Sequence, residues 1–189
     1  MTRPQIIQAT SASRGRVVET VVSAFASDPA FHYFFADKAT FNEQARTFAG
    51  YLFDKRVHQG TVWIIEDGAA VAMWDAPRAT NGVTETNDQL DLPDDTLKRL
   101  DRYDAAVEAA LPRSPYWYLG ILATHPDYAG RGWGRLVMTA GIDRAAAAGL
   151  PAYLETTNEN NVTLYERAGW QVTESMSVDG LPIWVMRHG

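Results

Sequence analysis

The chain has 189 residues, a formal net charge of −6 and no cysteine, and 46% of its residues are hydrophobic. This length and composition predict a single domain, residues 1–189, with a core that needs no covalent cross-link. The absence of cysteine excludes disulfides, thiolate–metal sites and a cysteine acyl-enzyme, and the acidic balance argues against a surface that wraps nucleic acid.

The first part of the chain predicts a strand, two helices and a pair of strands, at residues 6–9, 13–28, 40–58, 61–66 and 69–75. Ser13 is placed to cap the first helix, and Asp28-Pro29 is expected to end it. Asp67-Gly68 separates the two strands, and an acidic residue followed by glycine between β-rich runs is typical of a hairpin.

Residues 78–92 are polar without a clear period, so we expect a loop there. The remaining elements are expected to be a helix, a strand, a second helix, a strand, a short helix and a final hairpin, at residues 94–111, 116–124, from the glycine-rich loop to 148, 151–156, 160–168, 171–178 and 181–187. This order predicts a mixed α/β sheet in one domain.

Three glycines, Gly130, Gly132 and Gly134, stand directly before the helix that follows the strand at 116–124. Free N–H groups at a helix N-terminus attract phosphate, glycine allows close approach, and Arg131 and Arg135 add positive charge. A Walker A loop is excluded because no Lys-Ser or Lys-Thr follows, and a dinucleotide fingerprint is poorly matched. The remaining interpretations are a pyrophosphate loop and a simple tight turn.

Two segments resemble motifs of the GNAT superfamily of N-acetyltransferases. Residues 164–170, Leu-Tyr-Glu-Arg-Ala-Gly-Trp, resemble the family's Leu-Tyr-x-x-x-Gly-Phe segment, with Trp170 in place of Phe. The glycine loop resembles the family's Gln/Arg-x-x-Gly-x-Gly/Ala motif, with Ala129 at the Gln/Arg position. Further segments resemble the puromycin N-acetyltransferase branch, at residues 24–29, 62–74, 116–126, 154–156 and 161–167.

The resemblance implies a single-domain GNAT fold: a mixed, mostly antiparallel sheet with a splayed central pair of strands, flanked by helices. It also implies acetyl-CoA as co-substrate. By position, the residues that bind it are Leu122, Ala123, Thr124, Gly130, Arg131, Gly132, Trp133, Gly134, Arg135, Asn158 and Asn161.

Tyr165 corresponds to the tyrosine that the family uses as a general acid toward the leaving sulfur; the alternative is a tyrosine that only packs. For the general base, Glu155 is our first choice, because it lies on the strand next to the splay and faces away from Leu154. Asp75, His32 and water are the alternatives. No His, Asp or Glu group has metal-ligand spacing, so no metal is expected.

Aromatic residues suggest a wall for the acceptor. Residues 31–35, Phe-His-Tyr-Phe-Phe, lie in the stretch that covers the acceptor site in this family. With Trp63, Trp74 and Tyr116 they would hold a flat or bulky substrate, unless most of these rings belong to the core.

The sequence thus favours an acetyl-CoA-dependent N-acetyltransferase that acts on the primary amine of a small molecule, such as an aminonucleoside or another antibiotic. The alternatives are acetylation of a protein or aminoacyl amine, and a non-catalytic acyl-CoA-binding module. No signal segment or bilayer-spanning run is present in the sequence, so we expect a cytoplasmic monomer or homodimer, with no nucleic-acid or membrane partner.

Overall fold

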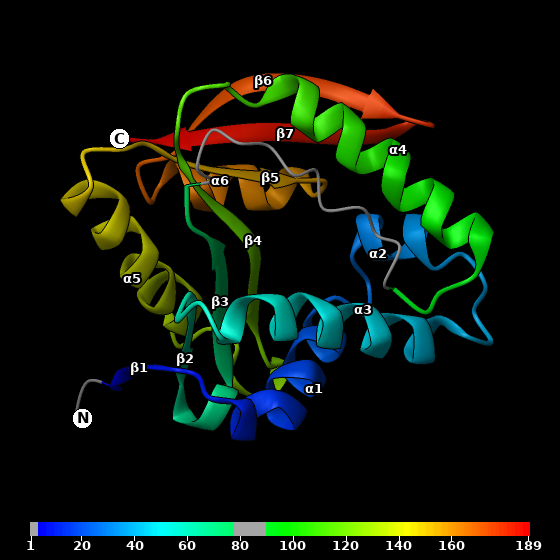
Figure 1. Cartoon of the computed structure of the whole chain (residues 1–189), viewed down its shortest axis with the longest axis horizontal. Coiled ribbons are helices and arrows are strands. Elements are labelled where there is room, and N and C mark those ends of the chain that lie inside the picture. The colour runs from blue at the N-terminus through cyan, green and yellow to red at the C-terminus, as the bar shows by residue number, and fades with distance from the viewer. Residues whose placement is uncertain (1–3, 78–89) are drawn as a thin grey trace.

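The computed structural model describes residues 4–77 and 90–189. Within these residues one seven-stranded sheet has the order β1-β2-β3-β4-β5-β7-β6 (Figure 1). Its strands are β1 Ile6–Gln8, β2 Val62–Ile65, β3 Ala70–Asp75, β4 Trp117–Thr124, β5 Ala152–Thr156, β6 Gln171–Val178 and β7 Leu181–His188. The β4–β5 pair is parallel and the other neighbours are antiparallel, which confirms the expected mixed sheet.

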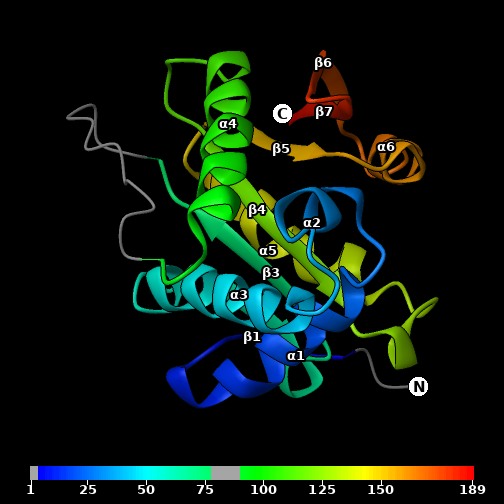
Figure 2. The same ribbon diagram turned by 90° about the vertical axis from the view of Figure 1, so that its right-hand side faces the viewer.

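Helices cover both faces of this sheet (Figures 1 and 2). They are α1 Arg14–Ala24, α2 Pro29–Phe34, α3 Phe41–Val57, α4 Asp94–Ala110, α5 Trp133–Ala147 and α6 Glu159–Glu166. Residues of α1 to α4 pack with Ile64 and Met73 in one buried cluster. Residues of α5 pack with Ile65 and Trp74 in another, because successive residues of a strand point to opposite faces.

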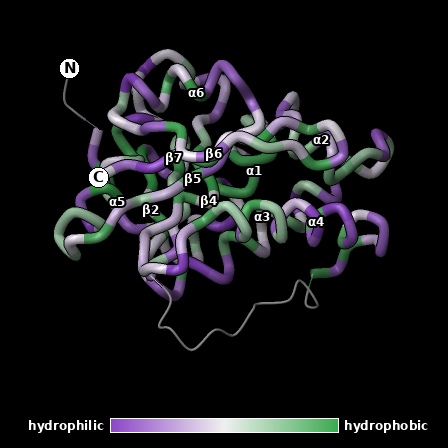
Figure 3. The backbone as a smooth tube through the Cα atoms, turned by 90° about the horizontal axis from the view of Figure 1, so that it is seen from above, coloured by the Kyte–Doolittle hydropathy of each residue, from purple (hydrophilic) through white to green (hydrophobic). Residues whose placement is uncertain are grey.

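The outermost helix of the first cluster, α4, is amphipathic. Its buried residues Thr96, Leu100, Tyr103 and Val107 recur at helical spacing, and its charged residues contribute the hydrophilic stretches of this helix (Figure 3). No described helix combines the length and the apolar character needed to cross a bilayer.

The second helix, α2, was not expected from the sequence. The expected end of the first helix at Asp28 was wrong, because α1 ends four residues earlier, at Ala24. Asp28 instead caps α2: its Oδ1 accepts hydrogen bonds from the backbone N–H of Ala30 (2.9 Å) and Phe31 (3.2 Å), with Pro29 in the first helical position. Six residues are too few to show a helical period, so only the capping pattern could have indicated this helix.

One further local expectation needs correction, and another is confirmed. Ser13 precedes α1 as expected, but its hydroxyl makes no capping bond to that helix and instead accepts from the backbone N–H of Thr10 (3.4 Å). The hairpin expected at Asp67-Gly68 is confirmed, because β2 and β3 pair antiparallel up to Ile65 and Ala70. Its connection contains a 3-10 turn, Glu66–Gly68, in which Glu66 and Asp67 both have positive φ. The loop expected at residues 78–92 lies mostly outside the described residues, although Leu90 is buried.

Candidate active site

The central strands β4 and β5 separate after a short paired stretch. Trp117 pairs with Ala152 and Tyr118 with Tyr153, and no pairing follows although both strands continue. On the other side, β4 stays paired with β3, apart from a bulge at Gly120. The far part of β4, which contains Leu122, Ala123 and Thr124, therefore has a free backbone edge toward β5, as the resemblance implied.

A cavity of about 1300 Å³ opens at this gap. It is lined by the edge of β4, by the glycine-rich loop, by the start of α6 and by residues of α2, α3 and α4. All the residues assigned to acetyl-CoA binding line it except Arg131, together with both assigned catalytic residues, Tyr165 and Glu155. A cavity of this volume is large enough for two joined ligands.

The glycine-rich loop is shaped by backbone that favours glycine. Gly130 (φ 77°) and Gly132 (φ 72°) are left-handed, and Gly132 is the N-cap of α5. A Cβ on Gly134 would lie 3.0 Å from Thr124 Oγ1, so the first turn of α5 sits close against the end of β4. The N–H groups of this turn have no partner inside the helix, which makes the loop a site for phosphate oxygens.

The arginines of the loop are arranged differently from each other. The Arg131 guanidinium lies 5.0 Å from the ring centre of Tyr128 and 5.2 Å from that of Trp133, and these two rings stack on each other. Arg131 is therefore held by aromatic faces at the exposed rim. Arg135 is also exposed, and it lines the cavity.

The two asparagines stand at the start of α6. Asn158 is the N-cap, and its Oδ1 accepts from the backbone N–H of Asn160 at 3.0 Å. The Nδ2 group of Asn161 donates to Thr156 Oγ1 at 3.5 Å. The capping bond uses only the amide oxygen of Asn158, so its amide N–H groups remain available toward the cavity.

Tyr165 is partly buried on α6 and packs edge-on against Trp170, with ring centres 6.1 Å apart. Its hydroxyl makes no hydrogen bond to the described residues, and the residue lines the cavity. Burial raises the pKa of Tyr165 above its usual range, and the nearby charges of Glu155 and Asp28 add to the shift. The phenol therefore stays protonated at neutral pH.

Glu155 lies on β5 two residues beyond Tyr153, the last residue that pairs with β4, and it lines the same cavity. Its carboxylate accepts hydrogen bonds from the hydroxyls of Tyr118 on β4 and Tyr103 on α4. Burial raises the pKa of Glu155 to about 7; the Tyr118 hydrogen bond lowers it, and the charge of Asp104 raises it. A carboxylate with this pKa can both accept and release a proton near neutral pH.

The two tyrosines beside Glu155 were missed by the sequence reasoning. Tyr103 lies three residues after Leu100 and four before Val107, so the helical period of α4 would have placed it on the inward face. Nothing local links Tyr118 to Glu155, because 37 positions separate them and a parallel strand pair brings them together.

The alternative bases are placed less favourably. Asp75 lines the cavity, but its Oδ2 is bound by Arg56 Nη2 at 2.5 Å. The exposed ring of His32 stacks on Phe41 outside the cavity, with Nε2 3.0 Å from the backbone oxygen of Ala26. In the described residues, no group of three or more His, Cys, Asp or Glu could hold a metal ion.

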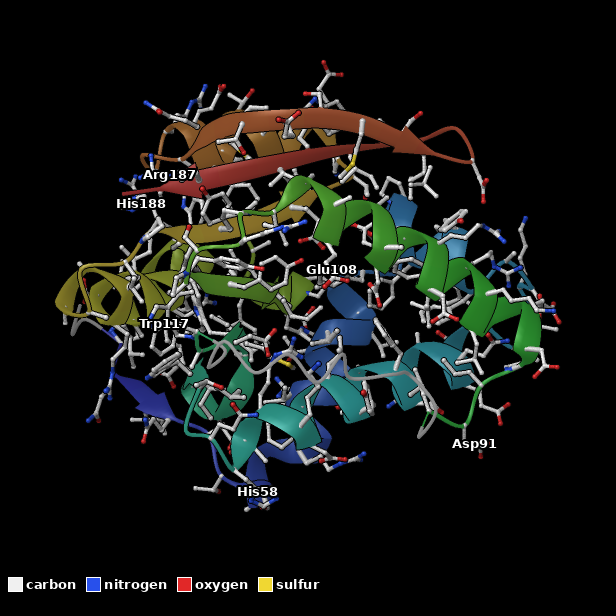
Figure 4. All side chains as sticks on the ribbon, turned by 45° about the horizontal axis from the view of Figure 1, so that its top comes forward. His58, Asp91, Glu108, Trp117, Arg187 and His188 are labelled. Atoms are coloured by element: carbon white, nitrogen blue, oxygen red, sulfur yellow. The ribbon has the colours of Figure 1, made fainter. Side chains whose placement is uncertain are left out.

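The aromatic wall is only partly as expected. Phe31, Phe34 and Tyr116 line the cavity. Trp63 and Trp74 do not: they are buried on the opposite face of the sheet, against α5, so assigning them to the acceptor was wrong. Glu108, on α4, also lines the cavity, whereas His58 lies on the outer surface at the end of α3 (Figure 4).

Comparison with known proteins gives the following matches. The model of the acetyltransferase (GNAT) family matches residues 21–170. A mycothiol acetyltransferase of Propionibacterium freudenreichii subsp. shermanii is 38% identical over 86 residues, which are 44% of this chain and 26% of that protein. The match thus spans about a quarter of that relative's length.

Solved structures share the fold over nearly the whole chain. A protein of Corynebacterium glutamicum described as histone acetyltransferase HPA2 and related acetyltransferase has a TM-score of 0.73 at 24% identity, covering 98% of this chain and 96% of that one. The polyamine N-acetyltransferase of Drosophila melanogaster has a TM-score of 0.71 at 14% identity, covering 98% and 99%.

Proposed function

Because the chain belongs to the acetyltransferase (GNAT) family, we propose that it transfers an acetyl group from acetyl-CoA to a primary amine of a small molecule. One observation carries this proposal: a single cavity contains the free edge of β4, the glycine-rich helix start, Tyr165 and Glu155. The first two features suit a CoA thioester, and the last two suit proton transfer on either side of it.

The proposed reaction is direct attack of the amine on the thioester carbonyl. Glu155 takes the proton that the amine loses as the C–N bond forms. Backbone N–H donors on the free edge of β4 stabilise the oxyanion, which is commonly the largest catalytic contribution. When the C–S bond breaks, Tyr165 donates its proton to the departing sulfur.

The finer proposal concerns the acceptor. The resemblance to the puromycin N-acetyltransferase branch suggests an aminonucleoside or a similar antibiotic amine, whose acetylation would remove a positive charge. The rings of Phe31, Phe34 and Tyr116 support an acceptor with a flat or apolar part. The net charge of −6 weighs against an aminoacyl-tRNA acceptor, because phosphate contacts require Lys and Arg.

The experiment is to follow the release of free CoA from acetyl-CoA across a panel of amines. The panel contains puromycin and related aminonucleosides, arylalkylamines, polyamines and a peptide with a free N-terminus. Turnover with one class establishes the transferase and its acceptor. Binding of acetyl-CoA without turnover on any amine would instead favour a non-catalytic acyl-CoA-binding module.

Replacing Tyr165 by Phe is expected to lower kcat by about 10- to 100-fold. The effect is modest because a phenol is a weaker acid than a thiol, by roughly 1.5 pKa units for the free groups, and burial weakens it further. The same CoA-release assay, at saturating acceptor, measures it. Unchanged kcat would remove Tyr165 from the mechanism and leave it a packing residue.

Replacing Gly132 by Ala is expected to raise the Kd for acetyl-CoA by about 5- to 30-fold. The loop of the free variant should relax out of the left-handed conformation, and readopting it on binding costs a non-glycine residue about 1–2 kcal/mol. Titration calorimetry measures this Kd. Gly149→Ala is the matched control, because Gly149 has positive φ (65°) at the opposite end of α5. An equal rise in both variants would mean that the loop does not hold the co-substrate.

A further inference from the structure

Two tyrosine side chains, from α4 and β4, meet the carboxylate of Glu155 on β5. The Tyr103 hydroxyl on α4 donates to Glu155 Oε1 at 3.3 Å, and the Tyr118 hydroxyl on β4 donates to Glu155 Oε2. Each oxygen of one carboxylate therefore has its own phenol donor.

This arrangement lies just beyond the point where β4 and β5 stop pairing. Tyr118 pairs with Tyr153, and that is the last pair before β4 and β5 separate. Glu155 is two residues further along β5, on the same face as Tyr153. The backbone of Glu155 is fixed from its other side, by pairing with Val185 of β7. Across the gap, the two phenols reach its side chain from β4 and α4.

We propose that Tyr118 and Tyr103 are positioning residues for acetyl transfer: by bonding one oxygen each, they fix the carboxylate of Glu155 at the opening between β4 and β5. This inference rests on the proposed function, in which Glu155 accepts the amine proton. The phenols do not touch the reacting atoms; they act through Glu155.

The hydrogen bonds from the two phenols also affect which protonation state Glu155 adopts, because other charges surround the carboxylate. Donated hydrogen bonds favour the ionised form of Glu155, whereas burial and the charge of Asp104 on α4 favour the neutral form. Tyr165 on α6 and Asp28 before α2 also interact electrostatically with this group of residues. Burial and the charge of Glu155 raise the pKa values of Tyr103 and Tyr118, so both phenols keep their protons and remain donors.

Replacing Tyr118 by Phe is expected to shift the acidic limb of kcat/KM upward by about one to two pH units. Removing a donor to a carboxylate raises the pKa of that carboxylate, here above its value of about 7. The rate should thus fall about 10-fold or more at pH 7 and recover at higher pH. Tyr103→Phe should give a smaller shift in the same direction, because its bond is longer.

A second readout does not depend on turnover. In protein labelled with ¹³C at glutamate carboxyls, the Glu155 signal is identified by its loss in Glu155→Gln and titrated without any ligand. The midpoint should rise in Tyr118→Phe and Tyr103→Phe. It should stay in place in the control Tyr153→Phe, which changes a buried tyrosine on the same strand that makes no hydrogen bond to Glu155.

The outcomes separate the two proposals. A raised midpoint together with a shifted rate profile supports the positioning role. Unmoved midpoints in both Phe variants, or a loss of rate that is equal at all pH values, would overturn it. Failure to acetylate any amine would refute the proposed function instead, and the ligand-free titration would still show whether the two phenols control the carboxylate.

Discussion

Replacing Glu155 by Gln is expected to lower kcat/KM by about 10²- to 10⁴-fold at neutral pH, the range for loss of a general base. Glutamine has nearly the same shape but cannot take the proton that the attacking amine must lose. In the native enzyme kcat/KM should fall as pH drops through about 7, because Glu155 becomes protonated there. The part of that limb due to Glu155 should be absent from the variant, in which only the ionisation of the acceptor amine remains.

The profile is measured with one acceptor throughout, so that the ionisation of the amine contributes equally to every variant. Glu108→Gln is the control, because it removes a carboxylate from the same cavity. If both variants lost activity equally, the total charge of the cavity would matter rather than a base. An unchanged limb in Glu155→Gln would refute the role of Glu155.

Replacing Glu155 by Gln should lower activity but raise stability at pH 8. Glu155 has a higher pKa when folded than when unfolded, so its protonated form favours the folded state. That contribution is complete below about pH 4.5 and is lost as pH rises through about 7. At pH 8, Glu155→Gln should therefore unfold at higher urea than the native protein. The gain should be below about 3 kcal/mol, since the amide oxygen of Gln replaces only one of two carboxylate acceptors.

Replacing Gly141 by Ala is expected to destabilise the protein by about 2–3 kcal/mol, or to lower Tm by about 5–10 °C. A Cβ at this position of α5 would lie 2.1, 2.3 and 2.5 Å from three ring atoms of Trp74. Trp74 is fully buried and stacks on Trp170, so it cannot easily move away. The overlap outweighs the gain of about 1 kcal/mol that alanine normally brings to a helix.

Urea unfolding followed by circular dichroism measures this change. Gly15→Ala is the matched control, because Gly15 is an exposed helical glycine in α1 where an added Cβ would meet nothing within 4 Å beyond its own helix. The control should be unchanged or up to about 1 kcal/mol more stable. Equal stability of Gly141→Ala and Gly15→Ala would mean that α5 can shift away from the sheet at no cost.

Most of the elements were predictable because their signals are local. The period of 3.6 residues in α3 and α4, the alternation in the strands and the glycines before α5 each act within one short segment. The exceptions have physical reasons. The short helix α2 has too few residues for a period, and Trp74 is apolar on a strand buried on both faces, so its pattern cannot show which face it covers.

The candidate site likewise has one part that the local sequence predicts and one part that it does not. The glycine-rich loop, Asn158 and Tyr165 stand in contiguous segments, so the sequence by itself determined them as one group through their resemblance to a family. The surroundings of Glu155 depend on Tyr118 and Tyr103, which lie 37 and 52 positions away. Only the tertiary structure decided that contact, because the register of β4 against β5 and the packing of α4 fix it, and both depend on the whole sheet rather than on neighbouring residues.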